Sequence, residues 1–158
     1  MAKEIERKFL VQENLWQPQD DGVRIRQGYL SSVRERVVRV RTKGTQGFLT
    51  VKGANQGITR LEFEYEVPFA EAEAMLALCE QPLIEKTRYL ETIDGHTWEI
   101  DCFFGANAGL VVAELELKTA DEPFVRPVWL GAEVSGDVRY YNSNLIAQPY
   151  CLWKTRSK

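Results

Sequence analysis

Residues 60–67, with the sequence RLEFEYEV, alternate strictly between polar and apolar side chains. A period of two places Glu62, Glu64 and Glu66 on one face of a β-strand and the apolar residues on the other. Related alternation or strand-forming composition recurs at residues 4–9, 26–30, 37–42, 48–53, 85–93, 97–104 and 110–118. The chain is therefore predicted to be mostly β.

About eight strands with short connections predict an antiparallel barrel, closed or nearly closed, with accessory helices. One helix is expected over residues 70–80, where apolar residues follow a helical period before Pro82. Short helices are expected near residues 127–130 and 143–147. The fold class is mostly β with accessory helices (α+β), in a single domain over residues 1–158, and the apolar strand faces are expected to pack against helices.

Composition narrows the function. The chain has 158 residues, 20 Lys and Arg against 23 Asp and Glu, and a formal net charge of −3, which argues against a dedicated binder of nucleic acid or of membrane surfaces. Residues 1–8 are mostly charged, unlike a signal peptide. Three separated cysteines and one histidine provide no Cys/His metal site and fit a reducing, cytoplasmic setting.

The second face of the strands is almost entirely charged. Like charges recur two residues apart, roughly 7 Å along a strand. Such clusters of one sign need a group of opposite charge between them. The charged positions are Glu4, Glu6, Lys8, Arg39, Arg41, Lys52, Glu62, Glu64, Glu66, Lys86, Arg88, Glu99, Asp101, Glu114, Glu116 and Lys118. The simplest alternative is a solvated face of paired surface charges.

A closed barrel would direct these charges into its interior. Clustered carboxylates without His or Cys suit a hard divalent cation such as Mg²⁺ or Mn²⁺. The neighbouring Arg and Lys side chains suit a polyanion, and a metal-bridged polyphosphate satisfies both groups.

The N-terminal segment Glu4-Ile5-Glu6-Arg7-Lys8 resembles the ExExK motif of the CYTH superfamily, the triphosphate tunnel metalloenzymes. The resemblance covers nearly the whole chain, because further matching segments follow in the family's order. They include QGYL at 27–30, RVR at 39–41, TVK at 50–52, EFE at 62–64, EKTRY at 85–89, EID at 99–101, AELE at 113–116 and RYYNSNL at 139–145.

The resemblance implies an eight-stranded antiparallel closed barrel that binds a triphosphate with Mg²⁺ or Mn²⁺. By position, it implies metal ligands at Glu4, Glu6, Glu62, Glu64, Asp101, Glu114 and Glu116. It implies phosphate-binding residues at Lys8, Arg39, Arg41, Lys52 and Arg88.

The pattern is most similar to the compact bacterial inorganic triphosphatases, which implies hydrolysis of tripolyphosphate to pyrophosphate and phosphate. The alternatives are a class IV adenylate cyclase, a thiamine triphosphatase, or a binding protein that holds polyphosphate or a nucleotide without turnover. The expected partner is a small-molecule triphosphate, with no nucleic acid or membrane, and a homodimer is an option because the outer strand faces are apolar.

Hydrolysis also needs a proton acceptor for the attacking water. The single histidine, His96, follows a turn signal at Asp94-Gly95 and is expected in a solvent-facing loop. We expect instead a catalytic dyad of Tyr29 and Lys86, in which nearby cations favour a neutral lysine. In the competing scheme Lys86 only binds phosphate, a metal-bound hydroxide attacks, and a glutamate accepts its proton.

Overall fold

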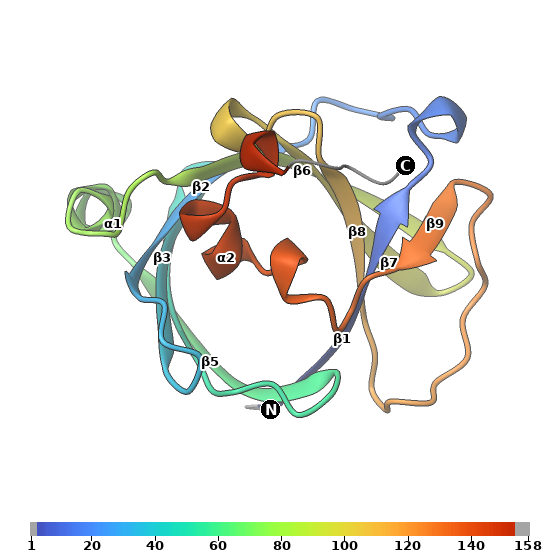
Figure 1. Cartoon of the computed structure of the whole chain (residues 1–158), viewed down its shortest axis with the longest axis horizontal. Helices are drawn as coiled ribbons and strands as arrows, with labels where there is room; N and C mark the ends of the chain where they lie inside the picture. The colour runs from blue at the N-terminus through green and yellow to red at the C-terminus, as the bar shows by residue number, and fades with distance from the viewer. Residues whose placement is uncertain (1–2, 154–158) are drawn as a thin grey trace.

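Eight antiparallel strands close into a barrel in the computed structural model, which describes residues 3–153 without the side chains of Lys3, Glu4 and Ser143. The neighbouring strands run in the order β5-β4-β3-β2-β6-β7-β8-β1, and pairing of β1 with β5 closes the circle (Figure 1). The strands are β1 (Lys3–Val11), β2 (Val23–Ser31), β3 (Val37–Lys43), β4 (Gln46–Lys52), β5 (Thr59–Val67), β6 (Ile84–Ile93), β7 (His96–Phe103) and β8 (Val111–Glu116). The predicted barrel is confirmed.

Tight turns keep sequential strands adjacent. Asp94 and Gly95 join β6 to β7 with positive φ angles of 51° and 83°. Two consecutive residues with positive φ match the twist of the strands that they connect, which makes this pair a strong hairpin signal. The turn consists of these two residues alone, so His96 is the first residue of β7 and not a loop residue as expected. Its Nε2 lies 2.7 Å from a carboxylate oxygen of Glu122.

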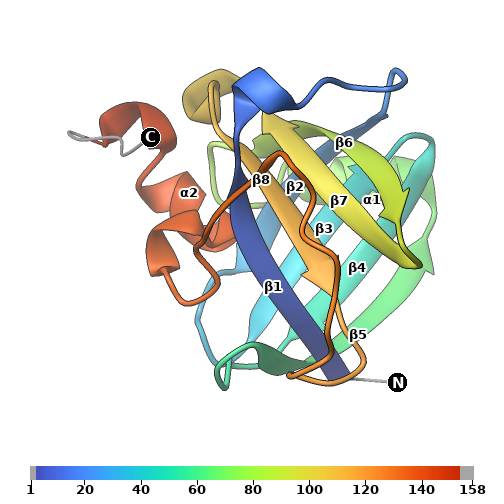
Figure 2. The ribbon, with the colours of Figure 1, turned by 90° about the vertical axis from the view of Figure 1, so that its right-hand side faces the viewer.

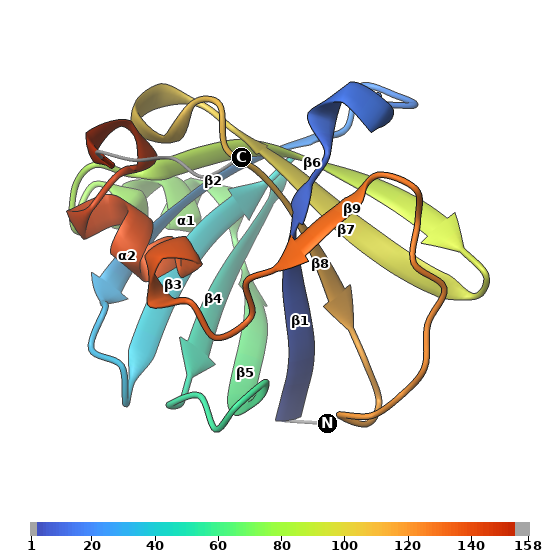
Figure 3. The same cartoon turned by 45° about the vertical axis from the view of Figure 1, so that its right-hand side comes forward.

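The outer face of the barrel is covered by two different structures. Helix α1 (Phe69–Leu76) is shorter than predicted and buries Ala72 and Leu76 with Val40 of β3. On the other side, the segment after β8 runs along the outside of β1 and β8 (Figures 2 and 3). Phe124 and Trp129 from this segment pack against the fully buried Trp98.

Two expectations for the outer face are wrong. Residues 127–130 form a turn instead of a helix, closed by the Leu130 N–H donating to the Pro127 carbonyl, and strand β9 (Leu130–Glu133) follows and pairs with β1. The apolar face of β5 lacks a helical cover, since Leu61, Phe63 and Tyr65 are 55%, 42% and 62% exposed. Helix α1 packs mainly against β3 and β4 and meets β5 at its end, where Val67 packs against the cluster of Ala72 and Leu76.

Helix α2 (Asn142–Ala147) lies across one end of the barrel, as Figure 1 shows. Its Leu145 is fully buried in a cluster with Ile84, Val112 and Tyr140, and this helix confirms the one expected near residues 143–147. Within residues 3–153, no helix combines the length and the apolar character required to cross a membrane.

Candidate active site

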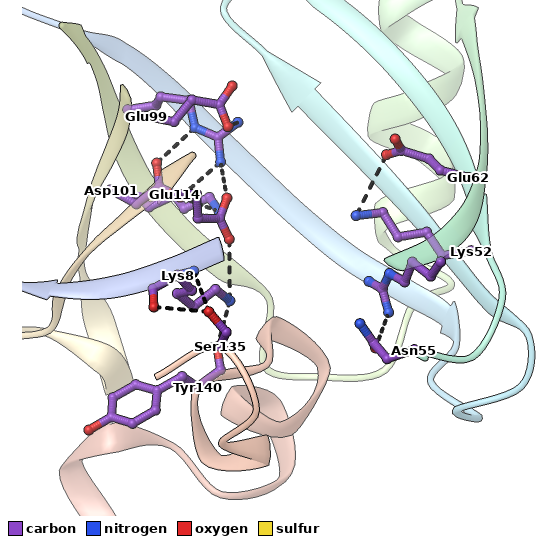
Figure 4. A network of polar contacts seen from close by, with 12 residues as sticks. Lys8, Lys52, Asn55, Glu62, Glu99, Asp101, Glu114, Ser135 and Tyr140 are labelled. Atoms are coloured by element: carbon purple, nitrogen blue, oxygen red, sulfur yellow. Dashed lines mark hydrogen bonds and ion pairs between the residues drawn. The ribbon is translucent and has the colours of Figure 1, made fainter. Parts of the chain in front are cut away.

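A polar cavity of about 260 Å³ lies inside the barrel. Its wall holds seven cationic and six acidic side chains, contributed by all strands of the barrel except β2. These are Lys8, Arg39, Arg41, Lys43, Lys52, Arg60 and Arg88, with Glu6, Glu62, Glu64, Glu99, Glu114 and Glu116. Figure 4 shows two groups of them facing each other, with Glu99, Glu114 and Lys8 on one wall and Lys52 and Glu62 on the other.

Four of the six carboxylates gather on β1, β8 and β7. Glu6 stands opposite Glu116 in the β1–β8 register, and Glu99 stands opposite Glu114 in the β7–β8 register. Like charges directly opposite on neighbouring strands are destabilising unless cations separate them. Glu114 has two such cations, Lys8 at 3.2 Å and Arg88 at 3.6 Å.

The two facing glutamates on β7 and β8 differ in pKa. Burial raises the pKa of Glu114, but Lys8 and Arg88 outweigh burial and lower the pKa to about 2. Burial also raises the pKa of Glu99, and there Arg88 only partly compensates, because Glu114 and Asp101 raise it further. The carboxylate of Glu114 is therefore firmly ionised, whereas its neighbour Glu99 has too little positive charge nearby to lower its pKa.

The opposite wall holds an excess of positive charge on β3. The Arg39 guanidinium donates to Thr50 Oγ1 at 3.3 Å and to Glu64 Oε1 at 3.4 Å. Arg41 makes an ion pair of 3.6 Å with Glu64 and lies 6.0 Å from the centre of the Phe48 ring, and no hydrogen bond joins its side chain to any described residue. Burial, and then the nearby charges of Arg39 and Arg88, lower the pKa of Arg41 to about 10.

Behind the cavity wall lies a buried ion-pair network on β6 and β7. Asp101 accepts hydrogen bonds from Arg88 Nε at 2.8 Å and Arg88 Nη2 at 2.9 Å, and Lys86 Nζ lies 2.8 Å from Asp101 Oδ2. The side chains of Lys86 and Asp101 are each only 1% exposed. Burial is the main cause that lowers the pKa of Lys86 to about 8, with Asp101 opposing it.

The segment that carries α2 contacts the cavity wall through Lys8. The Lys8 ammonium donates to the Tyr140 carbonyl at 3.0 Å, and the Lys8 backbone N–H donates to Ser135 Oγ at 3.0 Å. Tyr141 and Asn142, at the start of α2, also line the cavity. One end of the cavity is therefore closed by a segment that is bonded to a cation of the wall.

Most of the predicted site residues lie together in this wall. They are Glu6, Glu62, Glu64, Glu114 and Glu116 among the expected metal ligands, all five expected phosphate-binding residues Lys8, Arg39, Arg41, Lys52 and Arg88, and the expected catalytic Tyr29. Lys86 and Asp101 do not line the cavity. The side chain of Glu4 lies outside the described residues, although its backbone pairs with Arg60 in the β1–β5 register.

Tyr29 lines the cavity from β2, whereas Lys86 lies behind the wall on the neighbouring strand β6, and the two side chains make no hydrogen bond to each other within the described chain. Burial raises the pKa of the Tyr29 hydroxyl, while Arg39 and Lys8 oppose this change. The lysine is occupied by Asp101 instead.

Several cavity residues were not predicted as site residues. Lys43 and Arg60 each lie one step of the strand alternation from a predicted residue, and Glu99 was in the alternating charged set. Extending the alternation by one step at each strand end would have found the first two. Asn55, Ser135 and Asn142 come from loops and from α2, for which strand periodicity gives no signal.

No group of three or more His, Cys, Asp or Glu side chains is arranged to hold a metal ion by itself in the part of the chain that the structure describes. The five predicted carboxylates that line the cavity thus share it without forming a closed cage among the described side chains.

Comparison with known proteins identifies the family. The family model of the CYTH domain matches residues 2–150. An inorganic triphosphatase of Acetivibrio thermocellus is 50% identical over 95% of this chain and 97% of its own length, and an inorganic triphosphatase of Nitrosomonas europaea is 36% identical over 90% and 95%. A crystal structure of an inorganic triphosphatase matches with a TM-score of 0.65 at 35% identity, covering 92% of this chain and 95% of that one. Since the family model spans almost the whole chain and these relatives match along nearly their full lengths, this protein belongs to the CYTH family.

Proposed function

We propose that this protein hydrolyses inorganic triphosphate to pyrophosphate and phosphate inside the barrel. The observation that carries the proposal is Arg41, a guanidinium whose side chain is 9% exposed and which makes no hydrogen bond with the described residues. A buried charge with unused donors is costly unless an anion satisfies it. Arg39 and Arg88 add positive charge nearby, so the site favours a ligand with several negative charges.

A divalent cation, Mg²⁺ or Mn²⁺, belongs to this proposal, since triphosphatases of this family are generally metal-dependent. The donor set fits, because Glu6, Glu116, Glu114 and Glu99 offer only hard carboxylate oxygens. Mg²⁺ is usually bound by one or two carboxylates together with substrate phosphates and water. Such a cation needs no complete protein cage, which agrees with the open arrangement of these glutamates.

The size and lining of the cavity favour an inorganic substrate over a nucleotide or thiamine triphosphate. Its volume of about 260 Å³ is below the ~300 Å³ at which pockets for drug-sized ligands begin. Among the described residues in its wall, only Tyr29 and Tyr141 are aromatic. Stacking of a base or a thiamine ring uses aromatic faces, whereas a bare phosphate chain needs charges.

The bound cation would neutralise charge on the phosphoryl oxygens during transfer. The cationic residues Arg39, Arg41, Lys52, Lys8 and Arg88 would bind the remaining oxygens and hold the chain in line with the attacking water.

The proton of that water has two candidate routes. In the first, the cavity-lining Tyr29 orients the water and passes a proton to Lys86, whose pKa, lowered to about 8, makes the neutral form more accessible than in an ordinary lysine. In the second, Lys86 only supports Asp101 and Arg88, and a glutamate of the wall accepts the proton. Tyr29→Phe and Lys86→Ala separate these routes, because near-normal turnover in both variants excludes the first.

The experiment is phosphate release from tripolyphosphate, ATP, thiamine triphosphate and pyrophosphate, measured with Mg²⁺ and with EDTA. Arg41→Ala should abolish most activity, whereas Arg139→Ala, which removes an exposed guanidinium paired with Asp137, should keep it. We expect metal-dependent release with tripolyphosphate preferred. Tight binding of tripolyphosphate without release would refute hydrolysis and support a binding protein, and cyclic AMP from ATP would support a cyclase.

The cellular setting belongs to the same proposal. Cys79, Cys102 and Cys151 are free thiols, which fits a reducing cytoplasm. The exposed apolar residues of β5 favour a homodimer that covers them. Light scattering of the wild type and of Phe63→Glu tests this, and a monomeric wild type would refute it.

A further inference from the structure

One buried side chain of the barrel interior has no partner. Gln27 is 0% exposed, and neither its Oε1 nor its Nε2 has a hydrogen-bond partner among the described residues. Burying an unpaired amide is costly, and most buried polar groups in native proteins are paired. An amide kept at such a position needs a functional or structural reason.

The register shows what surrounds Gln27. On β2 it lies two residues before the cavity-lining Tyr29, so both side chains point inward. Its neighbour on β6 is Ile84, and Ile25 precedes it on the same face. These two apolar side chains provide no partner for an amide.

The neighbour of Gln27 on β3 is Arg41. Residues directly opposite on paired strands have Cβ atoms about 4.5–5.5 Å apart, within reach of long side chains. The Arg41 Nε is itself buried and without a partner in the described part of the chain. An unpaired acceptor and an unpaired donor therefore lie side by side on the same face of the sheet.

The buried Nε of Arg39 also lacks a partner among the described residues, but Arg39 stands opposite Tyr29 in the register and not opposite Gln27. Its guanidinium is already held by Thr50 and Glu64 from β4 and β5. Arg41 has the 3.6 Å ion pair with Glu64 and lies 6.0 Å from the centre of the Phe48 ring, so no hydrogen bond with the described residues fixes the plane of its guanidinium.

We propose that Gln27 is a positioning residue for Arg41: when phosphate binds in the cavity, the Gln27 amide oxygen, which has no partner in this structure, accepts the Nε–H of Arg41 and turns the two terminal amino groups toward that phosphate. The inference rests on the proposed function, in which Arg41 binds phosphate. Because this hydrogen bond forms only when the anion is bound, it adds to the affinity of the guanidinium for phosphate. The cost of the buried amide is thereby offset by tighter substrate binding.

The test compares Gln27→Leu with Gln27→Met, either of which removes the amide at similar size. Losing one hydrogen bond to a charged group should raise the KM for tripolyphosphate roughly tenfold or more, with a smaller change in kcat. The melting temperature should rise by about 2–4 °C, because an unpaired buried amide has been replaced by an apolar group. Gln46→Leu, which changes an exposed glutamine at the start of β4, should alter neither value.

A double-mutant cycle shows whether Gln27 acts through Arg41. Arg41→Lys keeps the positive charge and lacks Nε, so adding Gln27→Leu to it should have no further effect on KM. An unchanged KM in both Gln27 variants, or an equal increase in the Arg41→Lys background, would overturn the inference. Failure of the wild type to release phosphate would instead refute the proposed function, and the stabilisation of each variant by tripolyphosphate would still test Gln27.

Discussion

Replacing Asp101 by Asn removes a buried negative charge behind the cavity wall. This charge pairs with Lys86 and with Arg88, which itself lines the cavity. Burial alone would raise the pKa of Asp101, but Arg88 and Lys86 outweigh it and hold that pKa well below the ordinary value. Removing one partner from a buried ion pair costs ~3–5 kcal/mol, because the other charges stay buried without compensation. In a domain of this size each kcal/mol lowers the melting temperature by ~2–4 °C, so a fall of about 6–20 °C is expected.

Urea unfolding followed by tryptophan fluorescence, in EDTA, measures this loss. The matched control is Asp137→Asn, because Asp137 pairs with an exposed Arg139 at 2.7 Å, and exposed pairs contribute ~0–1 kcal/mol. EDTA separates an ion-pair role of Asp101 from a metal-ligand role. If Asp101 were only a metal ligand, Asp101→Asn would not change the free energy of unfolding in EDTA, where no metal is bound. A loss in Asp101→Asn no larger than in the control would refute the ion-pair role.

Three further predictions concern stability. Gly28→Ala should lower the free energy of unfolding by ~1–3 kcal/mol through overpacking, because its new Cβ would lie 2.7 Å from the Cβ of Cys79. The control Gly136→Ala should not destabilise, because its new Cβ would have nothing within 4 Å. Equal urea midpoints for the two variants would contradict this. The pKa of Glu114 is lowered to about 2 in the folded state, from ~4.3 in the unfolded state. The contribution of its ionised carboxylate to the free energy of unfolding is therefore complete above pH ~4.3 and is lost as the pH falls toward 2. Glu114→Gln should therefore lose less free energy of unfolding than the wild type between pH 5 and pH 2, and parallel losses would contradict the assignment. Leu145→Ala should cost ~2–5 kcal/mol, because this α2 side chain is fully buried, and a smaller loss by calorimetry would show that α2 packs loosely.

The alternation of charged and apolar residues predicted which face of each strand a side chain occupies. It therefore predicts a shared interior for Lys8, Arg41 and Glu114, which line one cavity in the structure. It could not give the depth of each residue within the barrel, because depth depends on the stagger between strands. Asp101 lies on the predicted face yet is buried with Lys86 behind Arg88, outside the cavity wall.

The outer surface was less predictable from sequence. Apolar residues on one strand face indicate burial, but Leu61, Phe63 and Tyr65 are exposed, because α1 is too short to cover β5. Strand β9 was missed because its four residues are too few to show a period. It exists because its backbone pairs with β1, a long-range contact that local sequence does not encode.

The unpaired amide of Gln27 also had no signal in the sequence. A glutamine in a strand is ordinary, and only the register opposite Arg41, with burial of both side chains, makes it unusual.

We propose that the inward charges of the barrel jointly bind a triphosphate and a cation. A crystal structure of the protein with tripolyphosphate and a divalent cation tests it most directly. We predict a phosphate oxygen within hydrogen-bonding distance of the Arg41 guanidinium, about 2.7–3.2 Å, and the cation between the phosphates and carboxylates of β1 and β8. Tripolyphosphate bound outside the barrel, with Arg41 still without a hydrogen bond, would contradict it.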